Sequence, residues 1–122
     1  MKVKTSELQG AVLDWAVAKA EGIELSHGCY NRLLVDGRMS AGQKMLAPYN
    51  PSTDWEQGGP IIERDIAKVE RFSEALWEAT AYTKDAQDIV QSGPTPLTAA
   101  MRCYVASKLG DEVEVPDELL QS

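Results

Sequence analysis

The sequence predicts an α+β fold, in which a small antiparallel or mixed sheet of three to five strands packs with three helices in an α-β-α sandwich-like arrangement. Two stretches, residues 7–21 and 96–109, repeat apolar residues at helical spacing and are followed by a glycine. A third helix start lies near residue 53, and short aromatic or β-branched runs typical of strands lie between the helices. The 122 residues are expected to form one domain, residues 1–122.

The composition indicates a protein that binds neither nucleic acid polymers nor membranes. The net charge is −7 and the pI is near 4.6, whereas contact with nucleic acid phosphates needs a basic face. No apolar run approaches the roughly 20 residues of a membrane span, and residues 1–10 lack the apolar region of a signal peptide. We therefore expect a cytoplasmic protein, in which Cys29 and Cys103 are reduced structural thiols.

The first quarter of the chain predicts a short strand followed by a helix. Residues 2–5 favour a strand, and Ser6 with Gln9 three residues later indicates a capping box that starts a helix over residues 7–21. Gly22 is typical of the residue that ends a helix. Beyond it, residues 29–35 favour one strand ended by an Asp36–Gly37 turn, and residues 38–48 favour a loop.

The second predicted helix begins at about Thr53 and ends near residue 64 or 65. Thr53 and Glu56 form a second potential capping box. Gly58, Gly59 and Pro60 follow inside the helix, where a glycine costs roughly 1 kcal/mol and a proline about 3 kcal/mol relative to alanine, so we expect the helix to bend or split. Two explanations stay open: the glycines pack tightly against another element, or they leave backbone bare for a ligand.

The last part of the chain predicts strands, a helix and an acidic end. Residues 66–83 suit either a helix or strands, and we favour strands. A polar connection leads through Gly93 to the third helix, which has Thr95 as its N-cap and Pro96 at its first position. Residues 112–116 favour an edge strand. The acidic segment 111–122 is either a solvated tail or a contact surface for a basic partner.

The residue types argue against an enzyme and against a bound metal or cofactor. His27 is the only histidine, so the chain offers few general bases, and no nucleophile elbow surrounds a serine. His27 and Cys29 are not accompanied by the further ligands of a tetrahedral metal site. Phosphate-binding glycine motifs are also missing from the sequence. We expect no catalytic residues, no metal and no cofactor.

The starts of the second and third helices combine hydroxyl groups with aromatic rings. Helix starts with nearby hydroxyls can hold a phosphate or a carboxylate, and Tyr49 and Trp55 could stack a planar ring. The alternative is that the hydroxyls only cap their helices and the rings fill the core. The predicted ligand-binding residues are Tyr49, Asn50, Ser52, Thr53, Trp55, Gly58, Gly59 and Thr95.

Three blocks of this sequence resemble the NinX-like proteins of lambdoid phages and enterobacterial prophages. The blocks are LDWAVAKAEG (13–22), YNPSTDWEQGGPIIER (49–64) and GPTPLTAAMRCYVASKLGDEVEVP (93–116). More distantly, they are similar to phage proteins with an α-β-α sandwich domain, from which this chain departs by its Gly58-Gly59-Pro60 insertion. The resemblance implies an origin and a fold, because the function of the family is unknown.

The resemblance implies a small accessory phage protein in the host cytoplasm, where interference with host defence or regulation is common. Our leading hypothesis is a non-enzymatic protein that binds a small, anionic, ring-bearing ligand of nucleotide type, such as a host immune signal. The alternative is a protein–protein adaptor or inhibitor that contacts a host protein through its acidic surface. A nucleotide hydrolase is a third reading, limited by the scarcity of bases. A homo-oligomer is expected, since small sequestering proteins often build pockets between subunits.

Overall fold

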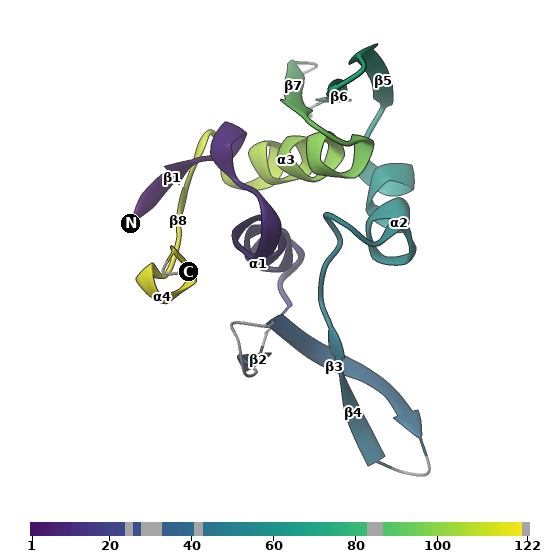
Figure 1. The fold of residues 1–122 in the computed structure, drawn as a ribbon, viewed down its shortest axis with the longest axis vertical. Helices are drawn as coiled ribbons and strands as arrows, with labels where there is room; N and C mark the ends of the chain where they lie inside the picture. Colours follow the sequence, from purple (N-terminus) through teal and green to yellow (C-terminus); the bar gives the residue numbers. More distant parts are fainter. Residues whose placement is uncertain (24–25, 28–32, 41–42, 83–86, 121–122) are drawn as a thin grey trace.

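In the part of the chain that the structure describes, the fold consists of three long helices and three small antiparallel sheets (Figure 1). The computed structural model describes residues 1–23, 26–27, 33–40, 43–82 and 87–120. The helices are α1 (Gly10–Glu21), α2 (Trp55–Asp65) and α3 (Pro96–Leu109), with a short α4 at Asp117–Leu120. The predicted α+β class is confirmed. Within the described residues, no helix is both long enough and apolar enough to cross a membrane.

Helix α3 lies at the centre of the molecule. Most of its side chains are buried, including three alanines, whose small size lets other elements approach from several sides. The sheet formed by β5 (Lys68–Ser73), β6 (Leu76–Tyr82) and β7 (Asp88–Gly93) packs on one side of α3, while α1 and α2 pack on the other (Figure 1). The Thr95 cap and the Gly110 end of this helix are both confirmed.

The β5–β6–β7 sheet has one buried face and one exposed face. Ala79 and Ala81 of the central strand are buried and belong to the core, whereas Leu76 and Tyr82 are exposed. This alternation follows the period of two that a strand requires. The choice of strands for residues 66–83 is confirmed. The prediction of a polar connection before Gly93 is wrong, because residues 88–93 form the strand β7. These residues have no apolar pattern of their own, and they form a strand because they pair with β6.

The start of the first helix differs from the prediction. Residues Thr5–Glu7 form one turn of 3-10 helix, and α1 begins only at Gly10, after Gln9 as its N-cap. The Ser6–Gln9 capping box is therefore wrong. Long-range contacts override it: Leu8 is buried and its carbonyl accepts from Arg102 Nε at 2.7 Å. The predicted end at Gly22 is confirmed, since this residue has the left-handed φ of 75°.

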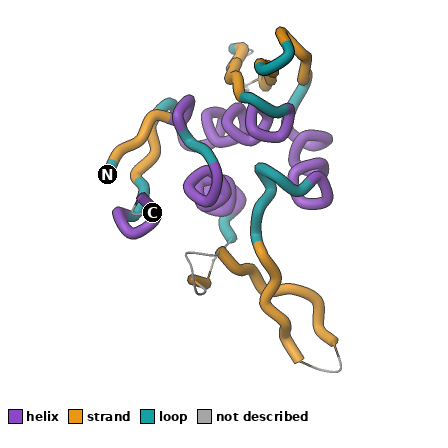
Figure 2. Tube along the Cα trace, in the orientation of Figure 1, coloured by secondary structure: helices purple, strands orange, loops and turns teal. Residues whose placement is uncertain are grey.

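Residues 33–40 and 43–48 form two paired antiparallel strands, where we predicted a strand that ends in a turn and is followed by a loop. Strand β3 (Leu33–Ser40) runs through the expected Asp36–Gly37 turn and pairs with β4 (Gln43–Pro48), while β2 (Ser26–His27) adds to its other side. The register shifts between Asp36 and Met39, so the glycine is absorbed as a bulge. This sheet reaches away from the helices (Figure 2). The predicted strand residue Cys29 lies outside the described residues.

Helix α2 is continuous from Trp55 to Asp65, with Pro60 inside it. The prediction that the glycines and proline split this helix is wrong. Its N-cap is Asp54, whose carboxylate accepts from the Glu56 amide at 2.9 Å, so the predicted Thr53 capping box is also wrong. Burial of Ile61 on the core offsets the hydrogen bond that proline removes.

The acidic C-terminal segment is folded where the structure describes it. Strand β8 (Glu112–Glu114) pairs with β1 (Lys2–Lys4), and this confirms the predicted strand. Val113, Val115 and Leu119 are buried in the core. A solvated tail is therefore wrong for residues 111–120.

Candidate functional site

The N-terminal ends of α2 and α3 meet at Gly58. A Cβ atom added to this glycine would lie 2.5 Å from the carbonyl oxygen of Pro51 and 2.6 Å from Cδ2 of Leu97. Both distances are shorter than van der Waals contact. The packing explanation therefore holds for Gly58, whose missing side chain lets the two helix starts approach each other.

A groove of about 250 Å³ opens between these two helix starts. Ser52, Thr53 and Trp55 line one side, and residues 95–98 line the other. Four of the eight predicted ligand-binding residues thus lie together, namely Ser52, Thr53, Trp55 and Thr95. Thr98 adds a further hydroxyl that the initial set omitted.

The other four predicted residues do not line this groove. Tyr49 is buried in the core, where burial raises the pKa of its hydroxyl. Asn50 shapes the loop instead: its carbonyl accepts from the amides of Thr53 and Asp54, at 3.1 and 2.9 Å. Gly58 is covered by its packing contacts, and Gly59 faces open space with no atom within 4 Å of its ideal Cβ position.

Trp55 supplies the exposed ring of the groove. The residue is 56% exposed, although it lies in the first turn of α2, a helix that buries Gly58 and Ile61. An exposed indole at the rim of a concave surface is an unusual use of an apolar side chain, and it provides a flat face for stacking.

The two helix starts differ in their electrostatics. Helix α3 has no acidic residue in its first turn, whereas α2 carries Asp54 and Glu56. In α3, Pro96 has no N–H, and the Thr98 amide donates to the Thr95 hydroxyl oxygen at 3.1 Å. The Leu97 amide, at the second helical position, has no acceptor within its own helix. The start of α3 is therefore the more favourable end for an anion.

A buried carboxylate that we did not predict lies beneath the loop before α2. Asp14 Oδ1 accepts from the Ser52 amide at 2.8 Å. Burial raises the pKa of Asp14 to about 6, although the Ser52 amide and the nearby Ser52 hydroxyl both lower it. That hydroxyl is itself buried, and no described residue meets it in hydrogen-bonding geometry, although it lies close enough to Asp14 to lower the pKa of that carboxyl. The sequence did contain a signal for this buried carboxylate, because Asp14 is a charged residue among the apolar residues that α1 buries, such as Leu13 and Val17.

Replacing Asp14 by asparagine should flatten the dependence of stability on pH. The native state binds a proton at Asp14 up to about pH 6, whereas an unfolded aspartate loses its proton near pH 4. The native protein therefore loses stability as the pH rises through this window, by roughly 3 kcal/mol in total. Urea unfolding at pH 5 and pH 7.5 should show Asp14→Asn gaining relative to wild type at the higher pH. A wild-type minus variant difference that does not change with pH would contradict this assignment.

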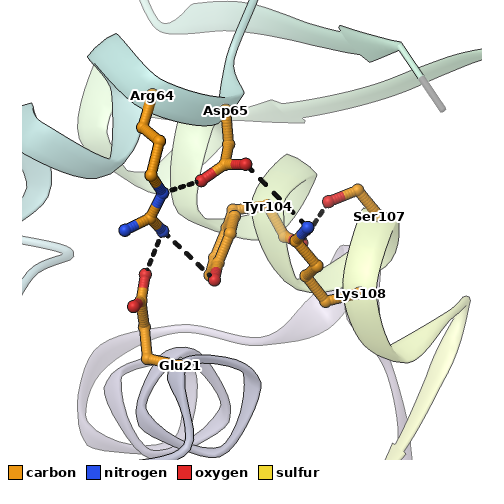
Figure 3. Close-up of polar contacts among 6 residues, drawn as sticks. All are labelled: Glu21, Arg64, Asp65, Tyr104, Ser107 and Lys108. Atoms are coloured by element: carbon orange, nitrogen blue, oxygen red, sulfur yellow. Dashed lines mark hydrogen bonds and ion pairs between the residues drawn. The ribbon is translucent and has the colours of Figure 1, made fainter. Parts of the chain in front are cut away.

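A second polar cluster joins the three long helices (Figure 3). Arg64 of α2 binds the carboxylates of Glu21 in α1 and Asp65 beside it, and its NH2 group lies 3.3 Å from the Tyr104 hydroxyl of α3. Burial raises the pKa of Tyr104 to about 12, so its hydroxyl stays protonated. Lys108 Nζ lies 3.9 Å from Asp65. This cluster links α1, α2 and α3 through side chains that are partly exposed.

The sequence matches the model of one protein family over residues 4–108, and that family is described as Bacteriophage P22, NinX. Comparison with curated proteins gives no match. The matched region contains all three long helices except the last residue of α3, and it contains every residue that lines the groove. Since this region covers most of the chain, the protein belongs to the phage P22 NinX family.

Proposed function

We propose that the groove between α2 and α3 binds a small, ring-bearing anion of nucleotide type, and that the protein sequesters this ligand without chemical change. One observation carries the proposal: the exposed Trp55 indole and the acid-free start of α3 line the same groove. A ring site and an anion site side by side match the two halves of a nucleotide.

The ring half of the site rests on Trp55. Stacking of a base on an aromatic side chain is worth about 1–3 kcal/mol, and it works for every base because each has a flat π face. Trp55 is the first residue of α2, so its backbone is already ordered and only the rotation of the indole is lost when a ring stacks on it.

The anion half of the site rests on α3. Its positive end, the Leu97 amide and the Thr98 hydroxyl can together bind an oxyanion without a lysine or arginine, whereas the Thr53 hydroxyl donates to the Asn50 carbonyl. Asp54 and Glu56 lie close to the same groove and repel a second negative charge. A singly charged group, such as a phosphodiester or a carboxylate, therefore fits better than a phosphate dianion.

The size of the groove limits the ligand further. At about 250 Å³ it lies just below the usual range for drug-sized ligands, so it suits one ring and one anionic group.

Thermal shift and calorimetry with cyclic dinucleotides, 3′,5′-cyclic mononucleotides and ADP-ribose test the proposal. We expect at least one of these to stabilise the wild-type protein, and Trp55→Ala to weaken its binding about tenfold or more, because the stacking energy is lost. Phe72→Ala is the matched control, since Phe72 is a comparably exposed aromatic outside the groove. Absence of any stabilisation at millimolar ligand, or equal binding by Trp55→Ala, would exclude the site.

Sequestration is separated from hydrolysis by following the bound molecule. If the protein only binds, the ligand should be recovered unchanged after prolonged incubation and heat release. Conversion of the ligand to products by wild-type protein would instead favour a nucleotide hydrolase. In a phage protein family, capture of a nucleotide signal would suit interference with host defence.

The alternative of an adaptor that acts through residues 111–122 has less support. Glu112 and Glu114 are exposed, but the N-terminal ammonium lies 3.0 Å from Glu114 and 3.3 Å from Asp117 and so neutralises part of this charge. Charge variants, and not deletions, are needed to test this surface because the segment contributes to the core.

A further inference from the structure

The β5–β6–β7 sheet leaves the face opposite α3 exposed, and we call this its outer face. The strand registers place Glu70, Leu76, Glu78, Tyr82 and Val90 on it, alternating with the residues that contact α3. A sheet face that carries apolar groups normally packs against a further layer. In the part of the chain that the structure describes, no helix covers this one (Figure 1).

The centre of the outer face is acidic. Glu70 and Glu78 are direct cross-strand partners, and like charges in such positions destabilise a sheet. Lys68 Nζ lies 3.3 Å from Glu70 Oε2 and compensates one of the two charges. Among the described side chains, no cation forms an ion pair with Glu78. The pair therefore offers an unmet site for a positive group.

Apolar side chains lie at both ends of this acidic centre. Leu76 marks one end of β6, and Tyr82, which is 62% exposed, marks the other, with Val90 46% exposed on the next strand. The two ends of β6 are roughly 20 Å apart, from the rise of a strand over six residues. Along β6, the outer face therefore presents an apolar group, then an acidic group, then an apolar group.

We propose that the outer face binds a basic amphipathic helix of a partner protein. About 13 residues of helix span the distance from Leu76 to Tyr82. Glu78 lies two residues from Leu76 and four residues from Tyr82, which is about 7 Å and about 13 Å along the strand. A helix with one lysine or arginine four positions after one apolar residue and ten positions before another presents all three groups on one face and matches this spacing.

Charge complementarity selects this occupant over a second copy of the chain. Two outer faces brought together would oppose four glutamates, in a chain whose net charge is already −7. The inference is independent of the proposed ligand, because no groove residue lies on the outer face.

The probe for this proposal is a synthetic 18-residue amphipathic peptide of leucine and lysine. Its matched controls are a scrambled peptide of the same composition and a peptide with glutamate in place of lysine. Titration into ¹⁵N-labelled protein should shift the β5–β7 amides with the first peptide and much less with the controls. Shifts confined to residues 111–120, or equal binding of the scrambled peptide, would overturn the proposal.

Variants of the protein test the two parts of the surface separately. Glu70→Gln with Glu78→Gln, and Tyr82→Ser with Val90→Thr, should each weaken binding at least fivefold at low salt. Glu112→Gln with Glu114→Gln removes the same charge elsewhere and should change it less than twofold. Sedimentation should show no dimer through this face. A dimer that Tyr82→Ser with Val90→Thr abolishes would assign the face to a second copy and reject the basic partner.

Discussion

Gly58→Ala is expected to destabilise the protein by roughly 3 kcal/mol, at the upper end of the usual cost of overpacking. The new methyl group would lie 2.5 Å from a backbone carbonyl oxygen, that of Pro51, and 2.6 Å from the Leu97 side chain. Leu97 lines the groove and can shift toward it, but the Pro51 carbonyl can move only with the loop that shapes the groove. Urea unfolding should show a lower midpoint with an unchanged slope.

Gly59→Ala is the control, and we expect the opposite sign. No atom lies within 4 Å of the added methyl group, and Gly59 is inside the same helix. Alanine should therefore stabilise α2 by roughly 0.5–1 kcal/mol, the usual helix preference over glycine. Equal effects at the two positions would show that Gly58 is not a packing contact. Gly58→Ala should also lower the affinity of the groove for its ligand, because the added methyl group pushes the two helix starts apart.

Removal of residues 111–122 is expected to abolish cooperative unfolding. The segment buries Val113, Val115 and Leu119, which together contribute roughly 5 kcal/mol at the usual value for fully buried apolar side chains. It also supplies the partner strand of β1 and the Asp111 carbonyl that accepts from the Thr5 amide at 2.7 Å. A loss of this size is comparable to the whole stability of a small domain.

Circular dichroism during heating measures this result. The matched variant Glu112→Gln with Glu114→Gln keeps the strand and its buried valines and should unfold cooperatively near the wild-type temperature. A truncated chain with an unchanged sharp transition would mean that the segment is dispensable for the core. In that case deletion would become a valid test of the adaptor hypothesis.

The fold was predictable from sequence where local chemistry decides the structure. The Thr95 cap with Pro96 started α3, and Gly22 and Gly110 ended two helices as expected. Prediction failed where distant residues decide. Arg102 holds the Leu8 carbonyl and keeps residues 8 and 9 out of α1, and β7 is a strand because β6 pairs with it. The β3 strand passes through Asp36–Gly37 because its pairing with β4 outweighs a turn signal.

The candidate site was half predictable for the same reason. We could predict Ser52, Thr53, Trp55 and Thr95 because the sequence shows where helices start. These residues lie in one groove because the close contact at Gly58 brings the starts of α2 and α3 together. The sequence could not show that the Tyr49 side chain is buried in the core while the Trp55 side chain is exposed, since both residues lie at the edge of the same loop. Asp14 was missed because its partner, the Ser52 amide, lies 38 positions away.

The pairing of β1 with β8 also has a consequence for the order in which the molecule is made. Lys2 lies opposite Glu114, so β1 is synthesised long before the strand that pairs with it. At the usual rate of translation β1 stays without this partner for on the order of ten seconds, until β8 has been added. A nascent chain that stalls before β8 therefore displays an open strand edge, which closes only when β8 pairs with β1.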